Sequence, residues 1–545
     1  MIEVIPAKST SQETIDKVVQ YCKMLGKVVI ICADRPGFVV NRFFVPWLNE
    51  ACLLLQEGVA SASQIDAAAC KAFKIGLGPF GLMNLTGPPI ALHSTDYLAE
   101  QLETPRYTGA KNLRDLIDSN QQWEISEEKE FSDDQYDIIS QRLYGVVFGV
   151  ATQIVEEGIC SMEDVDRGAK VGLRWAKGPF ELMNRIGVKK SFAMAESYSE
   201  LCKLSDGSSS WKVPEFFKHQ ASSDQSWDFS YVDTNIVNGV ATLTINRPEA
   251  MNALNETVVN QLSVAIEKVN GDDAVDTIVL DGAGKAFVAG ADVKFFVDKI
   301  RADSIDDIYE FTANGHRLLN SIENSSKTTI ALTTGLALGG GLELALSCDY
   351  RIGTKRSQFR FPETSIGIYP GLGGSQRPAK ICGIPAARWA VLAGNFMTAD
   401  AAFDLGLLTH LVEISAVDSC VSNCSKLGKP ENKYPGKPAN QDSKIVSFAT
   451  KFYSDENMQL LLNGQCPEGF DSEDKLISRQ LKNLKFTAPI ALSMASDLID
   501  ATASNSLADG LEIELSKLHD IFATNDALEG LSALIEGRRP TYNNS

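Results

Sequence analysis

A repeated segment in the first half of the chain constrains its fold more than any other feature. Residues 42–84 and 142–184 match at a constant offset of 100 positions. In each copy an apolar pattern with helical spacing ends at Glu-Gly, a serine begins the next helix, and Gly-Pro-Phe interrupts that helix. We therefore expect two small helical units that pack on each other as a duplicated pair. The residues shared by both copies, numbered in the first, are Arg42, Ala51, Glu57, Gly58, Ser61, Asp66, Gly78, Pro79, Phe80, Leu82, Met83 and Asn84.

One stretch of the first copy imitates a nucleotide-binding motif. Residues 76–81 read GLGPFG, which fits the dinucleotide pattern GxGxxG. A phosphate loop needs a preceding strand and free backbone N–H groups, whereas the residues before this stretch have a helical pattern and Pro79 has no N–H. The second copy reads AKGPFE at the same place. We interpret the stretch as a helix terminator, not a cofactor loop.

Length and charge narrow the possible functions. At 545 residues the chain is long enough for roughly three or four domains. A formal charge of −19 argues against nucleic acid or an anionic membrane as the main partner. The sequence shows no apolar run near the ~20 residues of a membrane span, and its first residues do not have the pattern of a signal peptide.

Cysteine and histidine usage indicates a reducing compartment and no catalytic metal. The 11 cysteines are scattered without a regular framework, which favours reduced thiols in a cytoplasmic protein. Cys420 and Cys424 are four positions apart, but no second pair and no histidine cluster follows them. The 5 histidines also show no ligand spacing. We therefore expect no metal site.

The pattern changes near residue 230. Short β-branched runs such as DTIVLDG and TTIALTT alternate with helical segments, which predicts an α/β domain of parallel βα units. The part after about residue 440 has helical patterns. Residues 415–445 are rich in Ser, Asn, Lys, Pro and Gly, which is typical of a surface insertion.

Three loops of this second half carry candidate chemistry. They read GAGKAFVAGAD, LGGGLE and FRFPETSIGIYPGLGGSQR, and the last two contain the acids Glu343 and Glu363. Amide N–H groups from two glycine-rich loops can form an oxyanion hole, and two nearby carboxylates can divide acid and base roles. Taken singly, each glycine-rich turn could be an ordinary helix start, and Glu343 a solvated acid. The ordered set of three favours a catalytic site.

The ordered set resembles the enoyl-CoA hydratase/isomerase (crotonase) superfamily over about residues 230–540. The resemblance implies that Glu343 and Glu363 are the two catalytic glutamates, with Glu363 the main proton donor and Glu343 the holder of water. It implies that N–H groups of Ala291 and Gly340 bind the thioester carbonyl. RPEAMNALN, residues 247–255, matches the motif on the CoA side. The residues that the resemblance assigns to substrate and CoA binding are Ala291, Asp292, Val293, Lys294 and Gly371.

The N-terminal part resembles another family that acts on the same thioesters. IEVIPAKSTS and DRPGFVVNRFFVPWLNEA look like the end of the NAD-binding domain and the helical domain of 3-hydroxyacyl-CoA dehydrogenases. In that family a histidine pairs with the glutamate that matches Glu3, and the asparagine that matches Asn41 contacts substrate. We expect the histidine and the NAD-binding unit to lie ahead of Met1, so that the dehydrogenase part is incomplete. Glu3 is then an exposed carboxylate, and Asn41 a ligand contact, a cap or a core amide.

These observations predict a multidomain chain. An all-α duplicated helical domain of the dehydrogenase C-terminal type, with a short α/β remnant, precedes an α/β crotonase fold with C-terminal helices. The expected boundaries are 1–33 for the remnant, 34–125 and 126–218 for the two copies, 219–229 for a linker, 230–415 for the crotonase core, 416–445 for the insertion and 446–545 for the C-terminal helices.

The expected function is reversible hydration of a trans-2-enoyl-CoA in fatty-acid or crotonyl-CoA metabolism. CoA arrives on the acyl-CoA thioester substrate, and hydration requires no cofactor. One alternative is an enoyl-CoA isomerase, which usually manages with one acid. Another is a dehydrogenase activity restored when a separate NAD-binding domain supplies NAD. The superfamily resemblance implies a homo-oligomer, a trimer or a dimer of trimers, and no nucleic-acid or membrane partner is expected.

Overall fold

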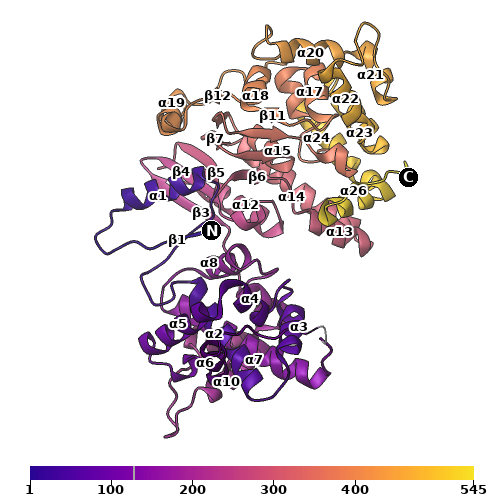
Figure 1. Ribbon diagram of the computed structural model, residues 1–545. Coiled ribbons are helices and arrows are strands. Elements are labelled where there is room, and N and C mark those ends of the chain that lie inside the picture. The colour runs from indigo at the N-terminus through magenta and orange to yellow at the C-terminus, as the bar shows by residue number, and fades with distance from the viewer. Residues whose placement is uncertain (127–128) are drawn as a thin grey trace. The chain divides into compact units, whose positions relative to one another are not determined.

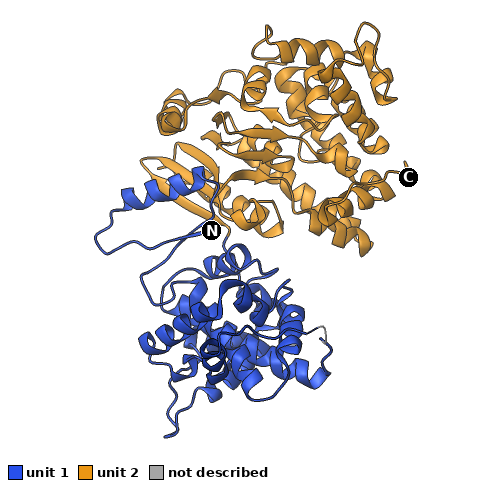
Figure 2. Ribbon diagram, viewed as in Figure 1, with its two compact units in different colours: residues 1–230 blue, residues 231–545 orange. Residues whose placement is uncertain are grey.

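The computed structural model describes residues 1–126 and 129–545. The chain forms two compact units, Met1–Ser230 (unit 1) and Tyr231–Ser545 (unit 2), which Figure 2 colours separately. The boundary lies one residue beyond the predicted linker, residues 219–229. The first part of that linker is helical, because a helix spans Glu215–Ser223.

Unit 1 begins with a small βαβ element. Strands β1 (Ile2–Val4) and β2 (Val29–Ile31) pair in parallel, and helix α1 (Gln12–Met24) connects them. The Ser11 side chain accepts the N–H of Thr14 and so caps α1, as a serine at this position usually does. The order strand, helix, strand agrees with the sequence-based prediction for residues 1–33.

The rest of unit 1 is helical and duplicated, as predicted. The long helix of the first copy, α2 (Val40–Gln56), packs against the long helix of the second copy, α7 (Asp133–Glu156), in the core of unit 1. The first copy contains α2 (Val40–Gln56), α3 (Ala62–Phe73), α4 (Pro79–Thr86), α5 (Pro88–Gln101) and α6 (Lys111–Asp118). The second contains α7 (Asp133–Glu156), α8 (Met162–Arg167), a π-helical turn (Gly168–Gly172), α9 (Pro179–Ile186), α10 (Val188–Leu201) and α11 (Glu215–Ser223) (Figure 1).

The recurring aspartates explain the Gly-Pro-Phe motif. The Asp66 carboxylate accepts N–H bonds from Phe80 at 2.7 Å and Gly81 at 2.8 Å, at the start of α4. Asp166 caps α9 in the same way, with bonds of 2.8 and 2.9 Å. These bonds satisfy N–H groups that a helix start leaves unpaired. Two amides of the GLGPFG stretch, those of Phe80 and Gly81, are therefore engaged by Asp66, and the stretch starts a helix instead of forming a phosphate loop.

The asparagine that recurs in each copy holds the segment at the end of that copy by hydrogen bonds. The Asn84 side chain forms a two-way pair with the backbone of Trp123, with both bonds at 2.9 Å. Asn184 forms the same pair with Trp227.

Helix α7 is long and apolar enough to cross a membrane, judged by length and composition alone. However, 72% of its most apolar stretch is buried inside the structure, as in the core helix of a globular unit.

Unit 2 is built on two sheets. The larger has the order β12-β9-β7-β5-β4-β3 and the smaller the order β11-β10-β8-β6. Only the β3–β4 and β10–β11 pairs are antiparallel. Central strand β5 is buried along almost its whole length, as expected for a strand covered on both faces. The strands are β3 (Val232–Val237), β4 (Val240–Ile245), β5 (Thr277–Gly282), β6 (Ala286–Ala289), β7 (Thr328–Leu332), β8 (Leu336–Leu338), β9 (Tyr350–Gly353), β10 (Gln358–Arg360), β11 (Met397–Thr398) and β12 (His410–Leu411).

Helices complete unit 2. Among those after residue 440, α20 and α23 pack on α17, whereas α24 and α25 pack on α14 and α26 packs on α13 (Figure 1). Helix α19 lies in the predicted surface insertion, residues 416–445, yet it packs on the larger sheet and buries Val417, Cys420 and Cys424. All 11 cysteines are free thiols. The helices are α12 (Glu256–Asn270), α13 (Val293–Arg301), α14 (Ile305–Glu323), α15 (Gly340–Leu346), α16 (Arg377–Cys382), α17 (Ile384–Val391), α18 (Ala399–Leu405), α19 (Val417–Leu427), α20 (Lys444–Phe452), α21 (Asp455–Leu462), α22 (Lys475–Lys485), α23 (Pro489–Asp500), α24 (Leu507–Ser516), α25 (Leu518–Phe522) and α26 (Asn525–Glu536).

Candidate active site

The smaller sheet of unit 2 brings the three predicted loops together. Strands β6, β8 and β10 are parallel neighbours, so their carboxyl ends meet at one edge of the sheet. The chain reaches Ala291 just after β6, Gly340 just after β8, and Glu363 just after β10. Ligands of open parallel sheets bind beyond this edge. The sheet topology therefore places the candidate residues where a site is expected.

Glu343 lies one turn into α15 and is buried, with 2% of its surface exposed. Its Oε1 atom accepts N–H bonds from Leu372 at 2.7 Å and Gly374 at 2.6 Å. Burial raises the pKa of this carboxyl to about 7, and the two amide bonds oppose the rise. A carboxyl with this pKa can exchange a proton with a bound water near neutral pH.

Glu363 starts the 3₁₀ turn Glu363–Ile366 and is also buried. Burial raises its pKa well above the ordinary range, and the negative charge of Glu343 raises it further. Within the described residues, Oε2 of Glu363 is buried without a hydrogen-bond partner. A buried polar atom without a partner is costly, which suggests that a ligand completes its bonding. Both effects favour the protonated form of Glu363 beside Glu343.

The backbone before α15 is shaped around Glu363. Gly339 has φ +48°, in the region that favours glycine, and a Cβ there would lie 2.3 Å from Oε1 of Glu363. A Cβ on the next residue, Gly340, would lie 3.8 Å from the amide nitrogen of Ala291. The glycines therefore let two loops and one carboxyl approach closely.

Two amide groups remain unpaired at this point. Within the described residues, no hydrogen-bond acceptor is found for the N–H of Ala291 or of Gly340. The neighbours of Ala291 are held by Leu254, which donates to Gly290 at 2.9 Å and accepts from Asp292 at 2.8 Å. Two fixed and adjacent N–H groups without acceptors are the donors that form an oxyanion hole.

The residues predicted to contact CoA lie at the start of α13 and in a nearby loop. Asp292 is the N-cap residue of α13 and forms an ion pair of 3.1 Å with Arg247, from the RPEAMNALN motif. Val293 and Lys294 lie in the first turn, where Lys294 is exposed. Gly371 is partly buried beside Leu518, Thr312 and Tyr369.

Glu514 was missed by the sequence-based prediction. It lies on α24, is fully buried, and accepts N–H bonds from Gly373 at 2.6 Å and Ser375 at 3.2 Å. Burial raises its pKa to about 8, and the charge of Glu343 adds to the rise. No motif surrounds Glu514 in the sequence, and the amphipathic pattern of its helix gave no signal of a buried acid.

His316 and Arg377 hold the carbonyls of the same loop. His316 Nε2 donates to the Gly371 carbonyl at 2.8 Å, and burial lowers its pKa to about 4, so the ring is neutral. The buried Arg377 donates to the Leu372 carbonyl at 2.9 Å and pairs with Glu323 at 2.8 Å. The loop 371–375 is thus fixed by its carbonyls as well as its amides.

The two dehydrogenase-type residues occupy unit 1. Oε1 of Glu3 accepts N–H bonds from Val39 at 3.0 Å and Val40 at 3.1 Å, at the start of α2. The expectation of a simply exposed carboxylate is therefore wrong, because Glu3 stabilises a helix start. Asn41 is exposed in the first turn of α2 and is neither a cap nor a core residue.

Comparisons with known proteins identify the families that the two halves of the chain match. The family model described as enoyl-CoA hydratase/isomerase matches residues 240–545. The chain belongs to this family. The family model for the C-terminal domain of 3-hydroxyacyl-CoA dehydrogenase matches residues 37–131 and 139–221, one match for each copy of the repeat. The fused architecture expected from the sequence is thus confirmed.

Individual relatives match the second half of the chain. The crotonyl-CoA hydratase of Syntrophomonas wolfei is 41% identical over 175 residues, which cover 32% of this chain and 66%, just under two thirds, of that protein. A probable enoyl-CoA hydratase of Rhizobium meliloti is 30% identical over 303 residues, 56% of this chain and 94% of that protein. The crystal structure of an enoyl-CoA hydratase from Rhodobacter sphaeroides shares the fold, with a TM-score of 0.50, 24% identity, and coverage of 58% and 92% of the two chains.

Proposed function

We propose that this protein is an enoyl-CoA hydratase that adds water reversibly to a trans-2-enoyl-CoA and forms a 3-hydroxyacyl-CoA. One observation carries the proposal: two buried glutamates with raised pKa values, Glu343 and Glu363, lie beside two unpaired amides. The names of the matched hydratases support the same reaction. The natural setting of such a step is fatty-acid or crotonyl-CoA metabolism.

The amides activate the substrate in this proposal. The thioester carbonyl oxygen accepts the N–H groups of Ala291 and Gly340, which stabilise the negative charge that develops as the enolate forms. The Arg247–Asp292 ion pair and the first turn of α13 lie next to Ala291 and support the CoA end. Binding energy from that end helps to align the reacting carbons.

The two glutamates transfer the protons during the addition of water. Glu343 accepts one proton from a bound water while the oxygen forms a bond with C3 of the enoyl chain. Glu363 donates its proton to C2, so that one H₂O is added in total. A proton passing from Glu343 to Glu363 restores the starting state. Burial and the charge of Glu343 raise the pKa of Glu363 well above its ordinary range, which supports the role of Glu363 as the proton donor.

This chemistry uses only side chains, amides and the CoA thioester of the substrate, so we propose that hydration requires no cofactor. We also propose a cytoplasmic homo-oligomer, a trimer or a dimer of trimers, without a nucleic-acid or membrane partner. The formal net charge of −19 supports the absence of a nucleic-acid partner.

The proposal is tested with crotonyl-CoA. Glu363→Gln should slow hydration by about 10²- to 10⁴-fold, the usual contribution of a general acid or base. Glu512→Gln, an exposed acid elsewhere in the same unit, is the matched control and should retain activity. Undiminished hydration in Glu363→Gln contradicts the mechanism. If Glu343→Gln abolishes hydration but leaves double-bond migration in a 3-enoyl-CoA intact, the isomerase alternative is favoured.

The match to the dehydrogenase C-terminal domain favours a second candidate function. In that case the protein oxidises a 3-hydroxyacyl-CoA when NAD is bound by a nucleotide-binding domain supplied separately. Formation of NADH from 3-hydroxybutyryl-CoA is the measurement, made with and without such a domain. Rate enhancement that depends on the added domain supports this candidate, and no NADH in either case excludes it.

A further inference from the structure

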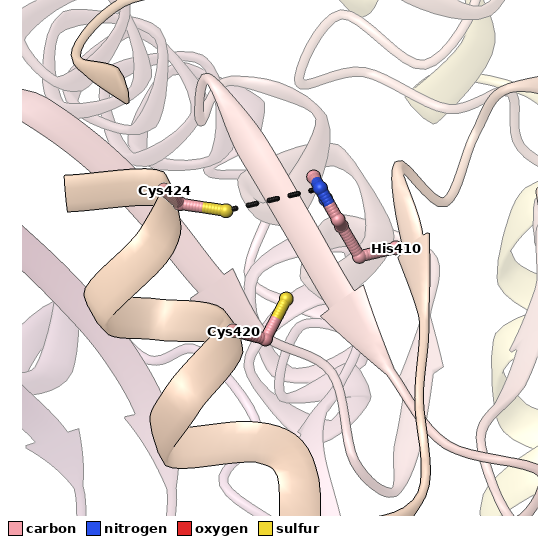
Figure 3. Close-up of side chains that lie close together, drawn as sticks. All are labelled: His410, Cys420 and Cys424. Carbon is pink, nitrogen blue, oxygen red and sulfur yellow. Dashed lines mark hydrogen bonds between the residues drawn. The ribbon is translucent and has the colours of Figure 1, made fainter. Parts of the chain in front are cut away.

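Three side chains with metal-binding atoms converge at the edge of the larger sheet of unit 2. His410 lies on edge strand β12, and Cys420 and Cys424 lie one turn apart on α19. Figure 3 shows both sulfurs projecting from the same face of α19 toward the His410 ring. Their ligand atoms all lie within 4.8 Å of one another, and Sγ of Cys424 is 3.9 Å from Nε2 of His410.

The hydrogen bonds around His410 determine which of its two ring nitrogens carries the proton. Nδ1 of His410 is 3.0 Å from the Thr409 hydroxyl, which uses its one proton to bond the Arg351 carbonyl at 2.8 Å. The hydroxyl can therefore only accept from the ring, so Nδ1 carries the proton. Nε2 is then unprotonated, with its lone pair available. Metal-binding histidines are commonly oriented by such a bond from the second ring nitrogen.

The surroundings favour a neutral, tightly held cluster. The two cysteines pack with the apolar side chains of Val279, Ile330 and Ile352 from three neighbouring strands. An unpaired thiolate is costly in such a place. Two thiolates and a neutral imidazole around a divalent cation carry no net charge, which removes this cost.

We propose that His410, Cys420 and Cys424 bind one Zn²⁺ ion, which joins α19 to edge strand β12. Thiolate sulfur and imidazole nitrogen are the ligands that zinc prefers in proteins. Zinc–ligand distances of about 2.3 Å to sulfur and 2.0–2.1 Å to nitrogen place tetrahedral ligands roughly 3.5–3.8 Å apart. The present spacing, at most 4.8 Å between any two ligand atoms, exceeds this range by no more than about 1 Å. The partly exposed side of His410 leaves the fourth position to water.

The spacing along the chain concealed this site. No histidine cluster or second cysteine pair follows Cys424; the histidine instead precedes Cys420 by ten positions and lies on a strand. The site lies apart from the glutamates, and the proposed hydration does not use it. Metal binding itself is therefore the readout, independent of the proposed function.

The experiment uses the full chain, stripped of metal by a chelator under reducing conditions. Titration with Co²⁺, as a spectroscopic probe, should produce thiolate-to-metal charge transfer and the visible bands of tetrahedral cobalt, saturating at one ion per chain. Zn²⁺ should displace the cobalt and raise the midpoint of thermal unfolding. Cys420→Ser, Cys424→Ser and His410→Gln should each abolish the one-to-one binding. Cys466→Ser, a partly exposed cysteine outside the cluster, is the matched control and should bind normally.

Several outcomes overturn the proposal: no stoichiometric binding, binding that survives all three substitutions, or loss of binding in Cys466→Ser as well. A measurement on the unaltered chain covers the case in which a variant fails to fold. Zn²⁺ should protect Cys420 and Cys424 from alkylation and leave Cys466 reactive, and equal labelling of all three contradicts the site.

Discussion

Glu343 and Glu514 bind alternate amides of one loop. Glu343 accepts the N–H groups of Leu372 and Gly374, and Glu514 accepts those of Gly373 and Ser375. The two acids come from helices far apart in the sequence. The position of Glu343 therefore depends on a loop that Glu514 holds from the other side, which makes Glu514 a positioning residue.

Replacing Glu514 should loosen this loop. In Glu514→Gln one acceptor oxygen becomes an amide nitrogen, which cannot accept from Gly373 or Ser375. Leaving a buried donor unsatisfied should lower the free energy of unfolding by about 1–3 kcal/mol and reduce kcat for hydration. Urea unfolding and steady-state kinetics measure both effects. Glu512→Gln, exposed on the same helix, should change neither, and equal effects in the two variants contradict the role of Glu514.

Hydration should have a bell-shaped dependence on pH. Activity should rise as Glu343 ionises around pH 7 and fall at higher pH, where Glu363 loses the proton that it donates. The rate of crotonyl-CoA hydration across the pH range, with enzyme stability checked at each point, measures this. A profile that stays flat through pH 7 contradicts the proton states assigned to the pair.

Stability should fall as pH rises through the range in which Glu343 differs between folded and unfolded chains. The unfolded carboxyl releases its proton near pH 4.5, whereas the folded one keeps it until about pH 7. The folded state binds more protons in this window, so the free energy of unfolding decreases there, by on the order of 3 kcal/mol at 1.36 kcal/mol per pKa unit. Glu343→Gln keeps an oxygen for both amides but does not titrate. Urea unfolding at several pH values should show a shallower fall in this variant; identical slopes contradict the assignment.

The sequence predicted the parts of the site that depend on local motifs and not those that depend on packing. Ala291, Gly340, Glu343 and Glu363 follow strands of one sheet, and glycine-rich loops mark each of them except Glu363, which follows a proline. Glu514 reaches the same loop from a helix with an ordinary amphipathic pattern, so only the folded structure shows its burial.

The repeat likewise predicted two helical copies but not how they bind each other. Identical residues at a fixed offset indicate duplication, and the helix caps follow from them locally. Two ion pairs join the copies crosswise: Arg42 of the first copy pairs with Glu157 of the second, and Arg142 of the second pairs with Glu57 of the first. These pairs depend on how the two copies pack.

Gly339→Ala should disturb Glu363 specifically. The added Cβ would lie 2.3 Å from Oε1 of Glu363, in addition to the strain of a positive φ. We expect hydration to fall at least tenfold and stability to decrease by about 1–3 kcal/mol. Gly464→Ala is the matched control, because Gly464 also has a positive φ but has nothing within 4 Å of its Cβ position. Comparable loss of hydration in both variants would show that backbone strain alone is responsible.

The crosswise ion pairs of unit 1 should differ in strength despite their symmetry. Arg42 is 1% exposed and pairs with Glu157 at 2.7 Å, whereas the equivalent Arg142 pairs with both Glu57 and Glu50. Glu157→Gln leaves the buried Arg42 without a carboxylate and should cost about 3–5 kcal/mol. Glu57→Gln leaves Arg142 with Glu50 and should cost less than about 1 kcal/mol, as for an exposed pair. Chemical unfolding of unit 1, followed by tryptophan fluorescence, compares the two variants; equal losses would mean that Glu50 does not compensate for Glu57.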